Sequence, residues 1–288
     1  MTKQISVLEF FKQFPDDDTC LEHLMNVRYG KEFNCPKCEK ASKFHRVTKR
    51  PVYGCQYCGH QISPMAGTPF ARSSTPLQKW FYAVYLFTTT RHGVPAKELQ
   101  RQLSVTYKTA WRMGHEIRKY MGKVDGDDGL SGHVEIDETY IGGKHGQRGR
   151  PNPKTSHKTV VFGMVERGGK IMTKVVSDVK RSTLVPIIKD NVEQGTTLST
   201  DEMTSYWYLY KQGFKHGMVS HGQEEWVNGI HHTNTIESFW ARLKLSIRGT
   251  HVHVSKKYMA NYLAEFEYRY NMRGENAPYM FNQLLQSF

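Results

Sequence analysis

Two C-x-x-C pairs constrain the fold of this chain more than any other feature of its sequence. The first pair is Cys35 and Cys38, the second is Cys55 and Cys58, and 16 residues lie between the pairs. This spacing is typical of a four-thiolate zinc site, in which two knuckles place four sulfurs tetrahedrally around one Zn²⁺. We therefore predict a zinc ribbon over 33–72, because the metal supplies the folding free energy that so short a segment cannot gain from a core of its own.

The cysteine usage also bears on the compartment in which the protein works. Four of the five cysteines lie in the two pairs, and metal-bound thiolates persist best in a reducing environment. A redox role for the cysteines is the alternative, although thioredoxin-like chemistry needs one such pair rather than two at ribbon spacing. The sequence has neither an apolar run of roughly 18 residues nor a signal-peptide pattern, so we expect a cytoplasmic protein without a membrane partner.

The positive charge is concentrated in one part of the chain. The segment 31–123 holds 17 Lys and Arg against four acids, which accounts for the whole net charge of +13. A concentrated positive field is expected of a protein that binds phosphate backbones, since each neutralised phosphate releases condensed counterions. A basic surface that serves only solubility is the alternative.

Helical patterning resumes after the ribbon, at 77–90, 94–103 and 106–120. The last two helices meet at a short turn, which is the pattern of a helix-turn-helix, and the second of them is basic enough to lie in a major groove. An amphipathic helix on an ordinary surface is the alternative. The residues predicted to contact DNA are Thr106, Lys108, Arg112, Arg118 and Lys119.

The second half of the chain has a different pattern. Strands are predicted at 133–136, 159–165, 171–177, 197–200 and 218–220, and helices at 183–193, 205–211, 235–247 and 256–272. This order predicts a mixed α/β sheet with flanking helices. The resulting segments are N-terminal helices at 1–32, the zinc ribbon at 33–72, the helix-turn-helix region at 73–124, a polar glycine-rich linker at 125–132 and a last domain at 133–288.

Three acidic residues in the second half have a pattern typical of phosphodiester cleavage. We expect one strand to end on Asp137 and another on Asp201, while Glu237 lies on a predicted helix. Catalysis by two metal ions needs carboxylates at adjacent strand ends and on a neighbouring helix, where they hold cations about 4 Å apart. One ion then activates the attacking water or 3′-hydroxyl and the other stabilises the leaving oxygen. Solvated surface carboxylates are the alternative for each acid taken singly.

The helix that carries Glu237 has two faces. Its buried stripe is predicted to be Ile236, Phe239, Trp240, Leu243 and Ile247. The other face presents Glu237 and Lys244, and Lys244 is placed to hold a phosphate near the metal ions. Two basic stretches flank this site in sequence and would clamp DNA, unless they are only an exposed loop and a solvated turn. Their candidate DNA-binding residues are Lys144, Arg148, Arg150, Arg248, Lys256 and Lys257.

Three motifs then resemble a known family. EIDETYIGG, STDEMTSY and HTNTIESFWARLKLSIRGTHVHVSKKY, behind a four-cysteine ribbon, closely resemble bacterial insertion-sequence transposases of the DDE superfamily that have an N-terminal zinc ribbon. The resemblance extends from about residue 10 to 275. It implies an RNase-H-like domain and Mg²⁺-dependent cleavage and strand transfer at terminal inverted repeats, with Mn²⁺ as an alternative ion. It also implies double-stranded DNA as partner, homo-oligomers on the DNA ends and association with the nucleoid.

The resemblance places the catalytic triad on Asp137, Asp201 and Glu237. Some relatives have an Asn in the third place, so Asn234 is an auxiliary candidate. Glu138 and Glu202 are the rivals, although strand alternation points them to the opposite face. A transposase-derived DNA-binding regulator without activity is the alternative function, and a structure-selective nuclease of the RNase H type is a third.

Overall fold

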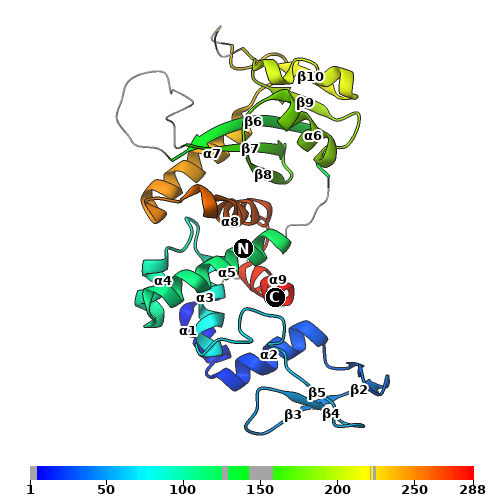
Figure 1. Ribbon diagram of the computed structural model, residues 1–288, viewed down its shortest axis with the longest axis vertical. Helices are drawn as coiled ribbons and strands as arrows, with labels where there is room; N and C mark the ends of the chain where they lie inside the picture. Colours follow the sequence, from blue (N-terminus) through cyan, green and yellow to red (C-terminus); the bar gives the residue numbers. More distant parts are fainter. Residues whose placement is uncertain (1–4, 125–128, 143–157, 221, 223–224) are drawn as a thin grey trace. The chain divides into compact units, whose positions relative to one another are not determined.

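The computed structural model describes residues 5–124, 129–142, 158–220, 222 and 225–288 (Figure 1). The chain divides into two units, the first built from Met1–Val124 with Gly274–Phe288 and the second from Asp125–Arg273. The return of the last residues to the first unit differs from the single domain expected over 133–288.

The N-terminal helices begin at side-chain caps. Helix α1 (Val7–Gln13) follows Ser6, whose hydroxyl and the Glu9 carboxylate form a capping box, and α2 (Asp17–Tyr29) follows the Asp16 cap. The buried aromatic residue of α1 is Phe10, which packs on Tyr85 with ring centroids 4.9 Å apart. Helix α1 is therefore held by aromatic packing, whereas α2 buries Cys20, Leu21, Leu24 and Met25.

The ribbon consists of two small antiparallel sheets. One pairs β1 (Phe33–Asn34) with β2 (Ala41–Ser42), and the other has the order β3-β4-β5. In each knuckle the residue after the second cysteine has a positive φ, 59° at Glu39 and 68° at Gly59, which turns the chain back tightly. The strands of the second sheet are β3 (Phe44–Arg46), β4 (Tyr53–Cys55) and β5 (Gln61–Ile62).

The rest of the first unit is helical. Helix α3 (Leu77–Thr89) lies at its centre, and α4 (Ala96–Leu103) ends at Ser104, whose left-handed backbone starts the turn into α5 (Tyr107–Val124). Helix α9 (Ala277–Ser287), which the sequence patterning did not identify, contacts α2, α3 and α5. Its apolar side chains Met280, Phe281, Leu284 and Leu285 are all buried.

A mixed five-stranded sheet forms the second unit, as predicted. Its order is β10-β9-β6-β7-β8, with antiparallel pairs from β6 to β8 and parallel pairs from β6 through β9 to β10. Strand β6 has β9 and β10 on one side and β7 and β8 on the other, so it is the central strand. The strands are β6 (His133–Ile141), β7 (Thr159–Glu166), β8 (Ile171–Val176), β9 (Thr197–Thr200) and β10 (Lys215–Met218).

Helices cover both faces of this sheet (Figure 1). Helix α6 (Arg181–Asn191) packs on the face that contains Ile136, through Leu184 and Ile188. Helices α7 (Asn234–Ser246) and α8 (Met259–Asn271) cover the other face. All five residues of the predicted apolar stripe on α7 are buried: Ile236, Phe239, Trp240, Leu243 and Ile247.

Three local expectations were wrong. Strand β6 continues to Ile141, so Asp137 lies in its middle rather than at its end. The strand expected at 218–220 is β10 and ends at Met218. The helix expected at 205–211 is instead two short 3₁₀ turns, η1 (Thr204–Tyr206) and η2 (Leu209–Gln212), which fits the burial of Tyr206 and Leu209 because 3₁₀ geometry aligns residues three apart.

No helix among the described residues combines the length and apolar character needed to cross a membrane.

Arg118 has a structural position within the first unit. Its side chain is 2% exposed, its guanidinium donates to the carbonyl oxygen of Val94 at 2.8 Å, and it lies 5.1 Å from the ring centroid of Phe87. A guanidinium buried in this way cannot reach a DNA groove. The expectation that Arg118 contacts DNA therefore does not fit the structure. The side chain points from α5 into the interior of the unit rather than to the basic surface.

We predict that Arg118→Ala lowers the free energy of unfolding by about 2–4 kcal/mol, because it leaves the Val94 carbonyl unpaired and opens a cavity beside Phe87. Chemical denaturation measures the change. Lys119→Ala, at the next and exposed position, is the control and should change stability by less than about 0.5 kcal/mol. Equal stability of the two variants would contradict the structural role of Arg118.

Candidate metal centres and active site

The four ribbon cysteines form a site suited to one zinc ion. Their sulfur atoms all lie within 4.8 Å of one another, with 3.6 Å between Cys35 and Cys58 and 3.9 Å between Cys38 and Cys55. Zn–S bonds of about 2.3 Å in a tetrahedron require S–S separations of about 3.8 Å, so the sulfurs are already placed for the metal.

Local hydrogen bonds favour the thiolate form of Cys55, whereas burial and the neighbouring cysteine side chains raise the pKa of Cys58 to about 11. Desolvation raises the pKa of Cys55, but hydrogen bonds from the Ser42 hydroxyl and from the backbone N–H groups of Cys58 and Tyr57 outweigh it and lower that pKa to about 6. Thiolates are the zinc ligands, and metal binding requires the thiol protons to leave. The ribbon residues therefore fit a structural zinc ion.

The sheet register brings two of the candidate acids together. Strands β6 and β9 are parallel, and their last paired residues are Glu135 and Ser199. Two residues further along the chain come Asp137, within β6, and Asp201, directly after the end of β9. Paired strands are spaced about 4.8 Å apart, so the two aspartates are neighbours. Because β9 ends at Thr200 while β6 continues, both aspartates lie at the point where the parallel pairing stops.

Glu237 approaches the same point from helix α7. Burial raises the pKa of Asp137 to about 8, and the neighbouring charges of Glu138, Asp201 and Glu237 add to the effect. All these acids therefore lie close enough to repel the negative charge of the Asp137 carboxylate. A group of acids that repel one another in this way is an arrangement that a cation would stabilise.

Packing fixes the orientation of Asp137. The Trp240 indole N–H of α7 donates to Asp137 Oδ2 at 3.0 Å. The indole ring passes over Gly163, which pairs with Asp137 in the sheet, and a Cβ there would lie only 2.6 Å from the Trp240 ring. The glycine on β7 therefore makes the room that allows the tryptophan to reach Asp137.

The rival acids have other partners. Glu138 points to the opposite face of the sheet, where its carboxylate accepts a hydrogen bond of 2.9 Å from the Tyr206 hydroxyl. The Glu202 carboxylate accepts from the Ser220 hydroxyl and from the backbone N–H of Gly222. The Glu138 carboxylate is thus held on the face opposite α7, and that of Glu202 is bound to the segment that follows β10.

The three candidate acids offer carboxylate oxygens, which are the kind of donor that suits divalent magnesium. In the described part of the chain, the cysteine group is the one set of three or more ligand atoms that lie within 4.8 Å of one another. Asp137, Asp201 and Glu237 do not form such a group by themselves. A pair of ions about 3.5–4 Å apart spans a wider group, and carboxylate oxygens are the ligands that Mg²⁺ prefers.

Lys244 lies two turns beyond Glu237 on α7. Partial burial lowers its pKa, while the negative charge of Asp137 raises it, so the ammonium group lies within electrostatic reach of the acids. Arg248 and Lys158 also contribute positive charge there. A phosphate beside the acids would therefore have cationic partners.

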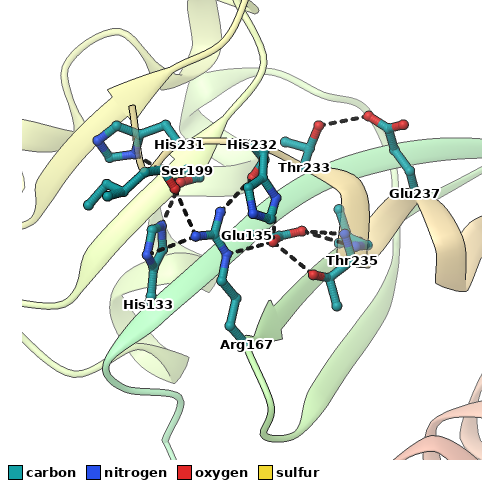
Figure 2. Close-up of polar contacts among 11 residues, drawn as sticks. His133, Glu135, Arg167, Ser199, His231, His232, Thr233, Thr235 and Glu237 are labelled. Carbon is teal, nitrogen blue, oxygen red and sulfur yellow. Dashed lines mark hydrogen bonds and ion pairs between the residues drawn. The ribbon is translucent and has the colours of Figure 1, made fainter. Parts of the chain in front are cut away.

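The sequence interpretation missed Glu135, two residues before Asp137 and on the same face of β6. Its carboxylate is fully buried and accepts hydrogen bonds from the backbone N–H groups of Thr235 (2.8 Å) and Ile236 (3.1 Å). These are N–H groups in the first turn of α7, which are ordinarily satisfied by the side chain of the N-cap residue. The N-cap residue Thr233 instead donates its hydroxyl to Glu237 at 2.7 Å (Figure 2).

Arg167 completes this network. Its guanidinium donates to Glu135 at 2.7 Å and to the backbone carbonyl oxygens of Ile230 and His232, which lie in the segment leading into α7 (Figure 2). One arginine thus neutralises the buried carboxylate and fixes the chain that enters the helix. An acid inside a strand, on the same face as a candidate catalytic acid, is the sequence signal that could have identified Glu135.

The predicted DNA-binding residues have different positions. Arg118 is buried, as described above, and Lys144, Arg148 and Arg150 lie outside the described residues. Asn234 is the first residue of α7 and is exposed. The remaining candidates are exposed: Thr106, Lys108, Arg112 and Lys119 in the first unit, and Arg248, Lys256 and Lys257 in the second.

Two family descriptions match this chain. The ISXO2-like transposase domain matches residues 129–271, which contain the three acids, and the transposase zinc-ribbon domain matches residues 15–61, which contain the four cysteines. The two matches thus coincide with the two candidate metal centres.

Two relatives support the same assignment. An uncharacterized protein in transposable element ISH50 of Halobacterium salinarum is 30% identical over 280 residues, which cover 90% of this chain and 92% of the relative. An uncharacterized transposase-like protein of Haemophilus influenzae is 30% identical over 102 residues, which cover 35% of this chain and 81% of that protein.

We predict that Cys38→Ser abolishes zinc binding and unfolds residues 33–68, because three thiolates hold the metal too weakly to supply the folding free energy of the ribbon. Metal analysis of the purified protein and hydrogen exchange of the ribbon amides measure the two effects. Cys20→Ser is the matched control, since Cys20 is buried outside the cluster. A Cys38→Ser protein with its zinc content unchanged would show that the four sulfurs are not the ligands.

A second prediction concerns the buried carboxylate. Glu135→Ala should lower the free energy of unfolding by about 3–5 kcal/mol, since it leaves the first-turn N–H groups of α7 and the Arg167 guanidinium without their partner. Glu135→Gln keeps an acceptor for the N–H groups and should lower the free energy of unfolding by roughly half as much. Thermal and denaturant unfolding measure the stabilities of the two variants. An alanine variant as stable as the wild type would contradict the structural role of Glu135.

Proposed function

The chain belongs to the insertion-sequence transposases that have an ISXO2-like transposase domain behind a zinc ribbon, and from this premise we propose that it cleaves DNA at the ends of a mobile element and joins them to target DNA. The observation that carries the chemistry is the register of β6 and β9, which brings Asp137 beside Asp201. Helix α7 adds Glu237 to the same point. We assign the sheet and its two helical layers to an RNase-H-like fold of the DDE type.

Asp137, Asp201 and Glu237 would hold two Mg²⁺ ions, for which Mn²⁺ is an alternative. Such a pair of ions supplies activation of the attacking water or 3′-hydroxyl and charge stabilisation of the leaving oxygen. The protein's own part is geometric, because Trp240 holds the Asp137 carboxylate and Thr233 holds that of Glu237. Side chains held in this way need little reorganisation when the ions and the DNA bind.

In this proposal Lys244 binds the phosphate of the DNA. Its ammonium group lies within electrostatic reach of Asp137, where it would bind a non-bridging oxygen of the scissile phosphate. The acids and the lysine are complementary in charge, because the acids attract cations and the lysine attracts the DNA backbone. Exposed Arg248, Lys256 and Lys257 would extend this contact along the DNA.

The first unit would read the element ends. We propose that α4 and α5 act as a helix-turn-helix, with exposed Thr106 and Lys108 at the start of α5 nearest the base edges. Arg112 and Lys119 are exposed further along α5, whereas Arg118 serves packing. Binding of two inverted repeats by a homo-oligomer would bring both DNA ends together.

We predict that Asp137→Asn and Asp201→Asn each reduce Mg²⁺-dependent cleavage of a repeat-end duplex by at least about 1,000-fold, because each removes a charged ligand of the ions. DNA binding measured without Mg²⁺ should stay nearly unchanged. A gel assay of strand cleavage, on duplexes made from the DNA that flanks the gene, measures the rate.

Glu202→Gln is the matched control, since this carboxylate neighbours Asp201 but has other hydrogen-bond partners. It should retain cleavage within about threefold. Cleavage at the wild-type rate in either aspartate variant would remove that residue from the site. A wild-type protein that binds the repeat ends but never cuts them would instead indicate a DNA-binding regulator without activity.

A further inference from the structure

An exposed aromatic surface begins a few residues after Asp201 in the chain, at Trp207. Trp207, Tyr208 and Tyr210 lie in and between the two 3₁₀ turns that replace the expected helix, and their side chains are 48%, 39% and 57% exposed. We call these three residues the aromatic shelf. Large aromatic side chains gathered on a surface are costly to leave in water, which marks them as a contact surface.

Buried side chains and hydrogen bonds fix the segment that carries the aromatic shelf. Tyr206 and Leu209, which alternate with the shelf residues, are buried in the core of the second unit. The Tyr206 hydroxyl donates to Glu138 at 2.9 Å, and the Ser205 hydroxyl donates to the carbonyl oxygen of Val179 at 2.6 Å. The exposed rings therefore belong to a segment that is fixed by its buried side chains Tyr206 and Leu209.

Trp207 of the aromatic shelf is fixed by a hydrogen bond of its own. Its indole N–H donates to the backbone carbonyl oxygen of Glu202 at 3.0 Å, which links the ring to the residue next to Asp201. The polar atom of the tryptophan is thus satisfied within the protein, and what remains for solvent is about half of an apolar ring. A ring with its only donor already paired is suited to stacking rather than to hydrogen bonding.

Cations lie over the shelf. The guanidinium of Arg181 is 4.4 Å from the ring centroid of Tyr208, and the ammonium of Lys211 is 5.0 Å from that ring and 5.8 Å from the ring of Tyr210. Positive charge among exposed rings complements a polyanion that also presents flat apolar faces. A single strand of nucleic acid has both properties, since its phosphates are charged and its bases are unstacked.

We propose that the aromatic shelf binds unpaired bases of a DNA strand beside the acidic site. In a duplex the base faces are hidden by stacking, so a protein ring can stack only on a base that has left the helix. The hydrogen bond from Trp207 to Glu202, the residue after Asp201, connects the shelf with DNA whose strands are being cut, and in this respect the proposal rests on the function proposed above. A second copy of this chain is the other occupant that an apolar surface would suit, but the cations over the rings favour DNA.

The test measures binding of the full-length protein to DNA without Mg²⁺, so that no cleavage is needed. The probes are a fluorescein-labelled oligothymidylate strand of about 20 nucleotides and a duplex of the same length, followed by fluorescence anisotropy. Trp207→Ala and Tyr210→Ala should each weaken single-strand binding on the order of tenfold, with about twofold or less for the duplex. Trp207→Phe, which keeps a ring, should bind within about threefold of the wild type.

Tyr279→Ala is the matched control, because Tyr279 on α9 is exposed to a similar extent, 44%, but lies in the other unit. It should bind both probes as the wild type does. Three results would overturn the proposal: alanine variants with wild-type affinity for the single strand, equal losses for single strand and duplex, or a fall in oligomer mass by light scattering that accounts for the loss. A wild-type protein that binds the strand but does not cleave repeat ends with Mg²⁺ would contradict the proposed function alone.

Discussion

The geometry of the candidate active site depends on the buried carboxylate of Glu135. It belongs to the same strand and the same face as Asp137, and it accepts the first-turn N–H groups of the helix that carries Glu237. One side chain therefore ties the strand of the first acid to the helix of the third. Because Glu135 satisfies the helix end, the hydroxyl of the N-cap residue Thr233 is free to orient Glu237 instead. Arg167 compensates the buried charge, without which the carboxylate would be costly to bury.

The features that the sequence did predict are those set by short-range rules. Two knuckles at ribbon spacing predict four sulfurs around a metal, and the sulfurs do lie within 4.8 Å of one another. Alternation and helical periodicity predicted a mixed five-stranded sheet, with four of its strands in place, and the buried stripe of α7 that contains Trp240. Asp137 and Asp201 were selected because each follows a β-type run, and the parallel register of β6 and β9 then makes them neighbours. Their roles as metal ligands remain a prediction.

The features that the sequence did not predict depend on contacts between distant residues. Arg118 has the spacing of a solvent-facing base on an amphipathic helix, and only the carbonyl of Val94, 24 residues away, shows why it turns inward. Glu135 is an acid inside an apolar strand, and its partners lie 100 residues away at the start of α7. Helix α9 follows the last domain in sequence, yet its apolar face is buried in the first unit. In each of these cases tertiary packing, rather than the local sequence pattern, determined where the residue or helix lies.

The central claim is that Asp137, Asp201 and Glu237 share a pair of divalent ions. Anomalous X-ray diffraction from crystals of the protein grown with Mn²⁺ and repeat-end DNA tests it most directly, since manganese scatters where Mg²⁺ would bind. The account predicts two peaks about 4 Å apart in contact with the three carboxylates, in addition to the zinc peak at the four cysteines. Manganese peaks located elsewhere, or none beside Asp137 while the DNA is in place, would contradict it.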